Sequence, residues 1–310
     1  MTNPSYEAAR RAANIENEAM VSVTPPSGLF RGSRKSMREI WEYRELLWLL
    51  VRREVKARYK DSYLGIVWSL FRPLAQLFIY YFAIGQILGA ARSLPDFAIL
   101  VFIGLTWWGL FAEIVQSTTT SVIGNAGLVK KTYLPREIFP LAATGGALVN
   151  FVIQVAVLLV AIAVISSYRL STDLLMAPVS MLIILCFGTA VGLILAAVNV
   201  YLRDVQHFVE VAIIILFWAS PIVYGFTFVA NALHGSWVEQ IYLSNPVTIS
   251  ILGAQKALWS QGTLATGDLA QSWPPDLWPR LLITLLISVV LLWIGQRIFA
   301  RLQGNFAQEL

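Results

Sequence analysis

The sequence predicts an all-α integral membrane protein with six transmembrane helices, preceded by an amphipathic interfacial helix. Of the 310 residues, 57% are hydrophobic and only 13% are charged, about half of the charged share that is usual in soluble domains. The mean hydropathy is +0.66, and several apolar runs can cross about 30 Å of hydrocarbon at 1.5 Å per residue. A soluble fold could not bury this much apolar surface, so the bilayer must solvate much of the chain.

The chain divides into three parts by composition. Residues 1–36 are polar, carry charges of both signs and lack an apolar signal-peptide core, which predicts a disordered cytoplasmic tail. Residues 37–61 place apolar side chains such as Trp48 and Val51 at helical spacing between basic ones, which predicts the interfacial helix. Residues 62–310 then form the membrane domain.

Six apolar spans are predicted within the membrane domain. Residues 230–276, between the fifth and the sixth, are still largely apolar and are broken by Asn245-Pro246. Irregular backbone at membrane depth survives only against protein or water, so we expect external re-entrant helices here. The predicted spans cover residues 64–88, 97–123, 137–165, 174–201, 207–229 and 277–299.

Basic residues set the expected orientation. With both termini in the cytoplasm, the inner flanks carry twelve Lys and Arg residues and the outer loops carry four. The positive-inside rule therefore predicts a multi-pass membrane protein with cytoplasmic termini. The net charge of +5 is explained by topology and contact with lipid headgroups, and it does not indicate a nucleic-acid partner.

The sequence shows no catalytic machinery. No lysine follows a glycine, so the phosphate-binding loop of an ATPase is absent. The two histidines lie far apart, the single Cys186 lies in an apolar run, and the aspartates are isolated. We therefore expect no catalytic residue, no metal site and no cofactor in this chain, and we expect any energy from ATP to come from a partner.

Aromatic residues are candidates for lining a passage for sugars, because their faces stack on sugar rings. As a group, Tyr80, Tyr81, Trp107 and Trp108 are the strongest candidates, although a lipid-facing or interfacial role explains most aromatic residues. Glu113 lies in the second span. It is either an interfacial group near a helix end or a pore-facing group that touches a polar solute.

Five motifs in order resemble the ABC-2 type permeases that export polysaccharides, such as the O-antigen and teichoic-acid exporters (Wzm- and TagG-like). Each motif alone is weak, but together they span residues 44–310. They are the basic segment 56–60 leading into Leu64-Gly65 and Arg72-Pro73, the loop Asn125–Pro140, the segment Asn199–Val205 followed by Ser220–Tyr224, the pair Asn245-Pro246, and the closing Phe306–Leu310.

The resemblance implies a homodimeric permease of the type V exporter fold, bound to two copies of an ABC ATPase subunit that carries ATP and Mg²⁺. The substrate would be a polysaccharide on an undecaprenyl-type lipid, moved outward from the cytoplasm. Residues 125–136 would form a coupling or gate helix. The implied ATPase contacts are Asn125, Leu128, Lys130, Lys131, Leu134, Pro135, Arg136, Arg203 and Asp204.

The basic segment would form the entrance for the lipid-linked pyrophosphate. Arginine can hold phosphate with two hydrogen bonds, and fixed positive charge suits the anionic headgroup level. For each of these residues, plain positive-inside topology is an equally good explanation. The entrance candidates are Arg52, Arg53, Lys56, Arg58, Lys60, Leu64 and Gly65.

Two other functions compete with glycan export. An ABC-2 permease for a drug or a small lipid would share the motifs. A membrane glycosyltransferase would need paired carboxylates or an Asp-x-Asp motif, and the sequence has neither. The identity of the glycan and the role of residues 1–36 are not set by these patterns.

Overall fold

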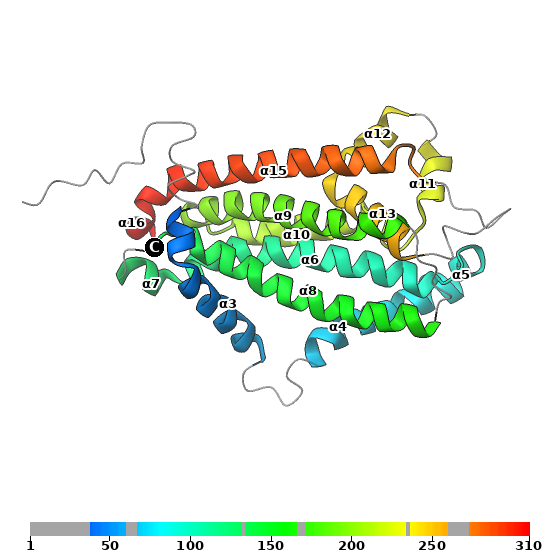
Figure 1. Cartoon of the computed structure of the whole chain (residues 1–310), viewed down its shortest axis with the longest axis horizontal. Helices are drawn as coiled ribbons and strands as arrows, with labels where there is room; N and C mark the ends of the chain where they lie inside the picture. The colour runs from blue at the N-terminus through cyan, green and yellow to red at the C-terminus, as the bar shows by residue number, and fades with distance from the viewer. Residues whose placement is uncertain (1–37, 60–66, 132–133, 166–171, 234–235, 260–272) are drawn as a thin grey trace, which may run out of the picture.

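The computed structural model describes residues 38–59, 67–131, 134–165, 172–233, 236–259 and 273–310. These residues form an elongated helical bundle with no strand among them (Figure 1). The helices are α3 (Arg44–Tyr59), α4 (Val67–Tyr80), α5 (Ala90–Ser93), α6 (Phe97–Gly124), α7 (Ala126–Lys131), α8 (Ile138–Ile165), α9 (Met176–Tyr201), α10 (Val205–Trp218), α11 (Phe226–Leu233), α12 (Trp237–Ser244), α13 (Pro246–Leu258), α15 (Leu277–Leu302) and α16 (Phe306–Glu309).

Four helices of the described residues are long and apolar enough to cross a membrane: Phe97–Gly124, Ile138–Val164, Thr172–Tyr201 and Leu277–Glu309. They correspond to the second, third, fourth and sixth predicted spans. Two shorter apolar helices, Pro73–Ile87 and Val205–Trp218, lie in the first and fifth. The prediction of an all-helical membrane protein is therefore confirmed, with four long helices in place of six.

The first predicted span is a two-part helix. Helix α4 begins at Val67, tolerates Pro73 in its interior, and continues as a π-helical segment from Tyr81 to Ile87. Residues 64–66 lie outside the described residues. The first apolar segment is thus irregular where the sequence predicted a single span.

The prediction of one continuous span over residues 207–229 is wrong. Helix α10 ends at Trp218, residues 220–224 are not helical, and α11 starts at Phe226. Pro221 explains the break, because proline lacks a backbone donor and disfavours a helical conformation in the residue before it. Gln255 of α13 donates a hydrogen bond of 2.8 Å to the Pro221 carbonyl, which satisfies one acceptor of the broken backbone.

Two helices, α12 and α13, occupy residues 237–258, and the re-entrant placement expected for this segment stays a prediction. Asn245 ends α12 and caps α13, since its side-chain oxygen accepts a hydrogen bond of 3.0 Å from the Val247 amide. Helix α13 is buried along almost its whole length and packs against α6, α9 and α15. Trp259 follows the last residue of α13, and its indole nitrogen donates a hydrogen bond of 2.8 Å to the Pro95 carbonyl.

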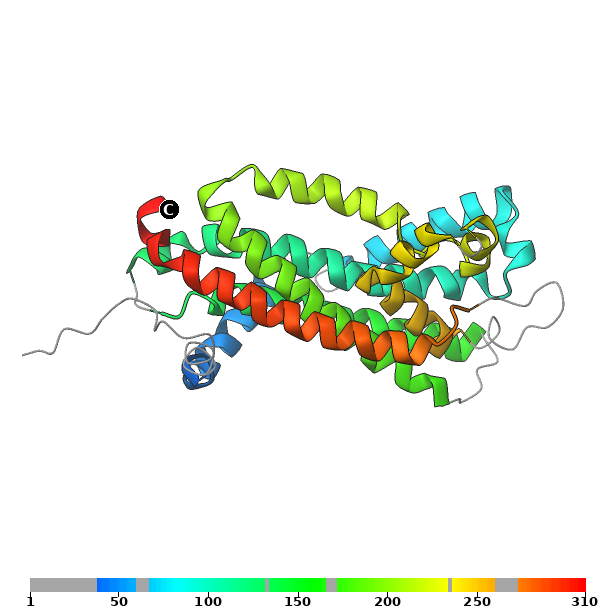
Figure 2. The same ribbon diagram turned by 90° about the horizontal axis from the view of Figure 1, so that it is seen from above.

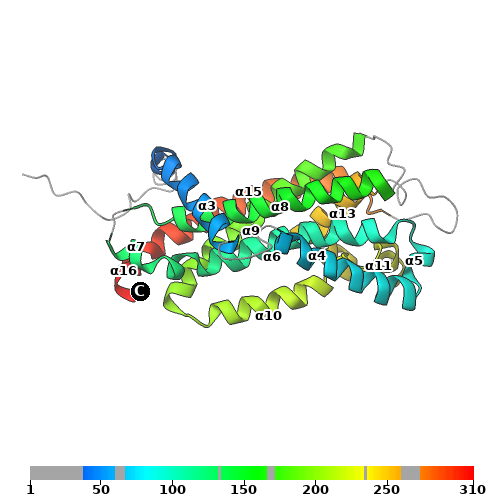
Figure 3. The ribbon, with the colours of Figure 1, turned by 90° about the horizontal axis from the view of Figure 1, so that it is seen from below.

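Helices α6 and α9 form the centre of the bundle, and α15 packs along α9. Small residues allow the close approach: a Cβ added at Gly295 of α15 would lie 2.7 Å from the Ala190 carbonyl oxygen of α9. A polar contact also joins the two central helices, since the buried Asn199 of α9 donates a hydrogen bond of 3.0 Å to the Thr119 carbonyl of α6. In Figures 2 and 3, α10 lies along one side of this core and α3 crosses α8 on the opposite side.

Candidate functional site

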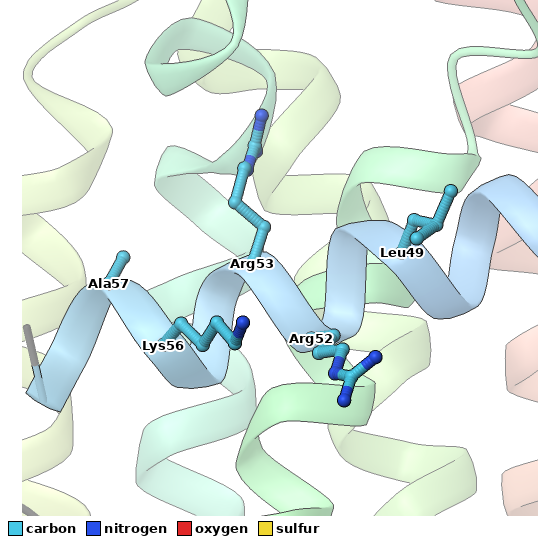
Figure 4. A pocket seen from close by; sticks show the side chains of 5 residues that line it. All are labelled: Leu49, Arg52, Arg53, Lys56 and Ala57. Carbon is cyan, nitrogen blue, oxygen red and sulfur yellow. The ribbon is translucent and has the colours of Figure 1, made fainter.

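The first candidate site is the basic face of α3. An open hollow of about 390 Å³ lies along this face and is lined by Leu49, Arg52, Arg53, Lys56 and Ala57. These positions recur at steps of three and four residues, so they share one side of the helix. Figure 4 shows Arg53 reaching away from α3 while Arg52 and Lys56 lie closer to the helix. Three cationic side chains therefore line one open hollow.

Helix α3 is held in place from its opposite side. Leu50 and Val51 are buried, and a Cβ added at Gly145 of α8 would lie only 2.6 Å from the Val51 side chain. Gly145 therefore lets α3 lie directly on α8. Trp41 and Trp48 remain exposed in the single chain, as suits a helix at a membrane surface, where tryptophan is enriched.

Arg53 connects the basic face to the predicted coupling loop. Its guanidinium donates a hydrogen bond to the Asn125 side-chain oxygen, and Asn125 lies between α6 and α7. Arg52 and Lys56 are exposed beside it. The side chain of Arg58 and all of Lys60, Leu64 and Gly65 lie outside the described residues. Their place at the lipid entrance therefore stays a prediction.

The predicted ATPase contacts gather at one end of the bundle, which we call the α7 end (Figure 1). Leu128, Lys130 and Lys131 of α7 are exposed, as are Arg203 and Asp204 between α9 and α10. Leu134, Pro135 and Arg136 are half-buried. Arg136 differs from the others, because it donates a hydrogen bond to the Gln303 carbonyl near the C-terminus.

The predicted channel aromatics do not form one cluster. Tyr80 stacks on Phe217 of α10 at 5.8 Å between ring centroids, and Trp108 meets the same ring at 5.7 Å. Trp107 is buried and packs edge-on against Phe151 of α8 at 5.1 Å. Tyr81 is exposed and accepts a hydrogen bond of 2.9 Å from Gln86. Of the four predicted channel aromatics, only Tyr80 and Trp108 therefore contact the same ring, that of Phe217.

Glu113 lies well inside the 28-residue α6, away from either helix end. It accepts a hydrogen bond of 2.6 Å from the Asn150 amide of α8. The reading of Glu113 as an interfacial residue near a helix end is therefore wrong. A carboxylate this deep in a spanning helix normally faces protein or water.

Glu113 belongs to a polar stripe on α6. Helix α6 is the most deeply buried of the four long helices, yet one side of its second half is open in the single chain. The fully exposed positions recur at helical spacing and carry Gln116, Thr120 and Gly124, while Ala112, Glu113, Ser117 and Ile123 beside them are half-buried. We define the α6 polar stripe as Gly109, Glu113, Gln116, Thr120 and Gly124, all exposed or half-buried.

The exposed surfaces of the other apolar helices differ in kind. They carry residues such as Val160 on α8, Ile214 on α10 and Leu286 on α15, as expected for a surface that faces lipid. Polar groups facing hydrocarbon are costly. The α6 polar stripe is therefore suited to face water or another protein rather than lipid. From this stripe, sequence reasoning had proposed only Glu113 as a residue that could line the path of the solute.

A family model described as ABC-2 type transporter matches residues 45–259. The chain belongs to the ABC-2 type transporter family. The matched range runs from α3 to the end of α13, so the basic face and the α6 polar stripe both lie within the ABC-2 region. The recognition made from the motifs is thereby confirmed at the level of the family.

The relatives of this ABC-2 chain include named export proteins. The O-antigen export system permease protein RfbA of Myxococcus xanthus is 29% identical over 274 residues, which cover 88% of this chain and 98% of the relative. RfbA of Klebsiella pneumoniae is 27% identical over 266 residues, covering 86% and 95%. The polysialic acid transport protein KpsM of Escherichia coli is 24% identical over 178 residues, covering 56% and 67%.

Proposed function

We propose that this chain is the transmembrane subunit of an ATP-driven exporter that moves a lipid-linked polysaccharide from the cytoplasm across the inner membrane. The observation that carries the proposal is the similarity to O-antigen export permeases over 86–88% of the chain. The relative named for polysialic acid transport is also a polysaccharide transport protein by name. A glycan is therefore the cargo class favoured over a drug or a small lipid.

The α6 polar stripe supports a hydrated path for the glycan. In the proposed homodimer a second copy covers the stripe, so that Glu113, Gln116 and Thr120 face water instead of lipid. Hydroxyl and amide groups exchange hydrogen bonds with sugars as readily as with water. Of the two aromatic residues that contact Phe217, Trp108 is buried, whereas Tyr80 is half-buried and leaves some aromatic surface open.

The distribution of basic residues supports cytoplasmic termini. Lys130, Lys131 and Arg203 lie at the α7 end, as does Arg301 close to the C-terminus. By the positive-inside rule this end faces the cytoplasm. The exposed part of α7 is then available to two copies of an ATPase subunit, which would bind ATP and Mg²⁺.

Deleting the gene and restoring it in the native bacterium tests this function. Loss of the gene should remove a surface polysaccharide and cause its lipid-linked form to accumulate inside the cell. The purified chain should show no ATP hydrolysis, whereas hydrolysis should appear when the partner ATPase is co-expressed. Unchanged surface glycan in the deletion strain, or hydrolysis by the chain alone, would contradict the proposal.

The basic face of α3 should bind the pyrophosphate of the lipid carrier. Replacing Arg52 and Lys56 together by glutamine removes two charges, each worth about 1 kcal/mol near an anionic surface. We expect roughly ten- to thirtyfold weaker binding of undecaprenyl pyrophosphate to the purified protein, measured by titration in nanodiscs.

Arg44→Gln is the matched control for this prediction. Arg44 lies on the same helix and is also exposed, but its guanidinium donates to the Trp41 carbonyl and it does not line the hollow. The control should bind the lipid as the unmodified protein does. If both variants lost lipid binding equally, the basic residues would be explained by membrane topology alone.

A further inference from the structure

The C-terminal segment Gln303–Leu310 is folded back onto the α7 end of the bundle. Phe306 is completely buried although it lies only four residues from the end of the chain. Its ring meets Phe299 of α15 at 5.5 Å and Tyr201 of α9 at 6.0 Å, both edge-on. Edge-to-face aromatic pairs stabilise such packing beyond the apolar area that they bury.

Two polar contacts reinforce this packing. The Tyr201 hydroxyl donates a hydrogen bond of 2.7 Å to the Leu302 carbonyl. Arg136, from the loop after α7, donates to the Gln303 carbonyl and lies over the Phe306 ring at 5.7 Å. A cation over an aromatic face is an attractive contact. The segment is therefore joined both to the end of α9 and to the coupling loop.

Helix α16 also packs directly against α7, and Figure 1 shows the two side by side at the same end of the molecule. Val129, on the inner side of α7, is buried together with Phe306 in one apolar cluster. Lys130 and Lys131 remain exposed on the outer side. The inner side of α7 thus rests on the C-terminal segment while its outer side stays available.

We propose that the C-terminal segment is a brace that fixes α7 to α9 and α15, and that Phe306 is its positioning residue. The proposal rests on the proposed function in one respect, namely that an ATPase subunit pushes on α7. A short helix of six residues has few contacts of its own to resist that push. The brace makes α7 move as one body with the long helices, so that work done on α7 reaches the membrane domain.

Spin labels test the brace directly. In a Cys186→Ala background, labels at Lys131→Cys on α7 and Ala307→Cys on α16 occupy two exposed positions. In assembled transporter in which labelled protomers are diluted with unlabelled ones, the label pair within one protomer should give one narrow distance distribution, and ATP should leave it unchanged. Phe306→Ala should broaden the distribution, whereas Gln308→Ala, an exposed position in the same segment, should not. A broad distribution without Phe306→Ala, or a distance that ATP changes, would overturn the proposal.

Transport measurements separate positioning from simple stability. In assembled Phe306→Ala transporter, ATP hydrolysis should stay within about twofold while glycan export falls roughly tenfold, since coupling between sites is commonly of this size. Phe306→Leu keeps apolar volume and should restore most of the export. A parallel loss of assembly, hydrolysis and export, or full export with Phe306→Ala, would contradict the brace.

A second variant covers the case in which Phe306→Ala does not assemble. Arg136→Gln keeps the buried ring and removes the guanidinium from it, and it should broaden the distances and lower export in the same way. If no glycan is exported even by the unmodified protein, the proposed function fails. The brace proposal can still be tested in that case, because the spin-label distances are measured without a substrate.

Discussion

Replacing Gly295 by valine is expected to destabilise the membrane domain by roughly 3 kcal/mol, near the upper end of what overpacking costs. Gly295 of α15 lies against the α9 backbone, where an added Cβ would be 2.7 Å from the Ala190 carbonyl oxygen and 3.2 Å from its Cα. Backbone atoms cannot rotate away as a flexible side chain could. The melting temperature in detergent and the amount of protein in the membrane should both fall.

Gly124→Val is the matched control for this effect. Gly124 is the last residue of α6, another long helix, and apart from its chain neighbours and the backbone of its own helix no heavy atom lies within 4 Å of a Cβ added there. The melting temperature of this variant should stay close to that of the unmodified protein. Equal destabilisation at both positions would mean that the low helix propensity of valine, rather than the contact between α9 and α15, causes the loss of stability.

Making the α6 polar stripe apolar is expected to block export without unfolding the protein. In Gln116→Leu combined with Thr120→Leu, two exposed polar side chains become apolar and can no longer replace the hydrogen bonds of a hydrated glycan. Export should fall about tenfold or more, since every 1.4 kcal/mol added to a barrier slows passage tenfold. Surface polysaccharide, normalised to the amount of permease in the membrane, measures the effect.

Ile214→Leu combined with Ile215→Leu on α10 is the control. These two positions are exposed like the stripe positions but are already apolar, so export should persist. Gln116→Asn combined with Thr120→Ser keeps the polar character and should also retain most of the export. Normal export with the leucine pair on α6 would show that the stripe does not face the glycan.

Hydropathy and proline placement predicted most of the fold. The four long helices follow the predicted spans closely because a run of apolar residues has few alternatives to a helix in a bilayer. The fifth span failed because a hydropathy pattern does not register a single backbone break. Residues 219–229 are apolar enough to extend α10, yet Pro221 stops it, and Gln255 from a distant helix supports the interruption.

The candidate site was only partly accessible to sequence reasoning. The basic face of α3 follows from residue spacing alone. The bond between Arg53 and Asn125 joins residues 72 positions apart, and no local pattern predicts it. Neighbouring residues on a helix point in different directions, so Trp107 and Trp108 could not share one surface. The α6 polar stripe required knowing which side of α6 its neighbours leave open.

The placement of α3 on Gly145 of α8 has a mechanical consequence. Helix α8 starts at Ile138, immediately after the coupling loop, and Arg53 ties α3 to Asn125 at the start of that loop. The basic face of α3 and the predicted coupling loop are therefore both attached to α8. Under the proposed function, a tilt of α8 would carry the basic face and a lipid headgroup bound to it along with the loop, without a conformational change having to cross the centre of the bundle.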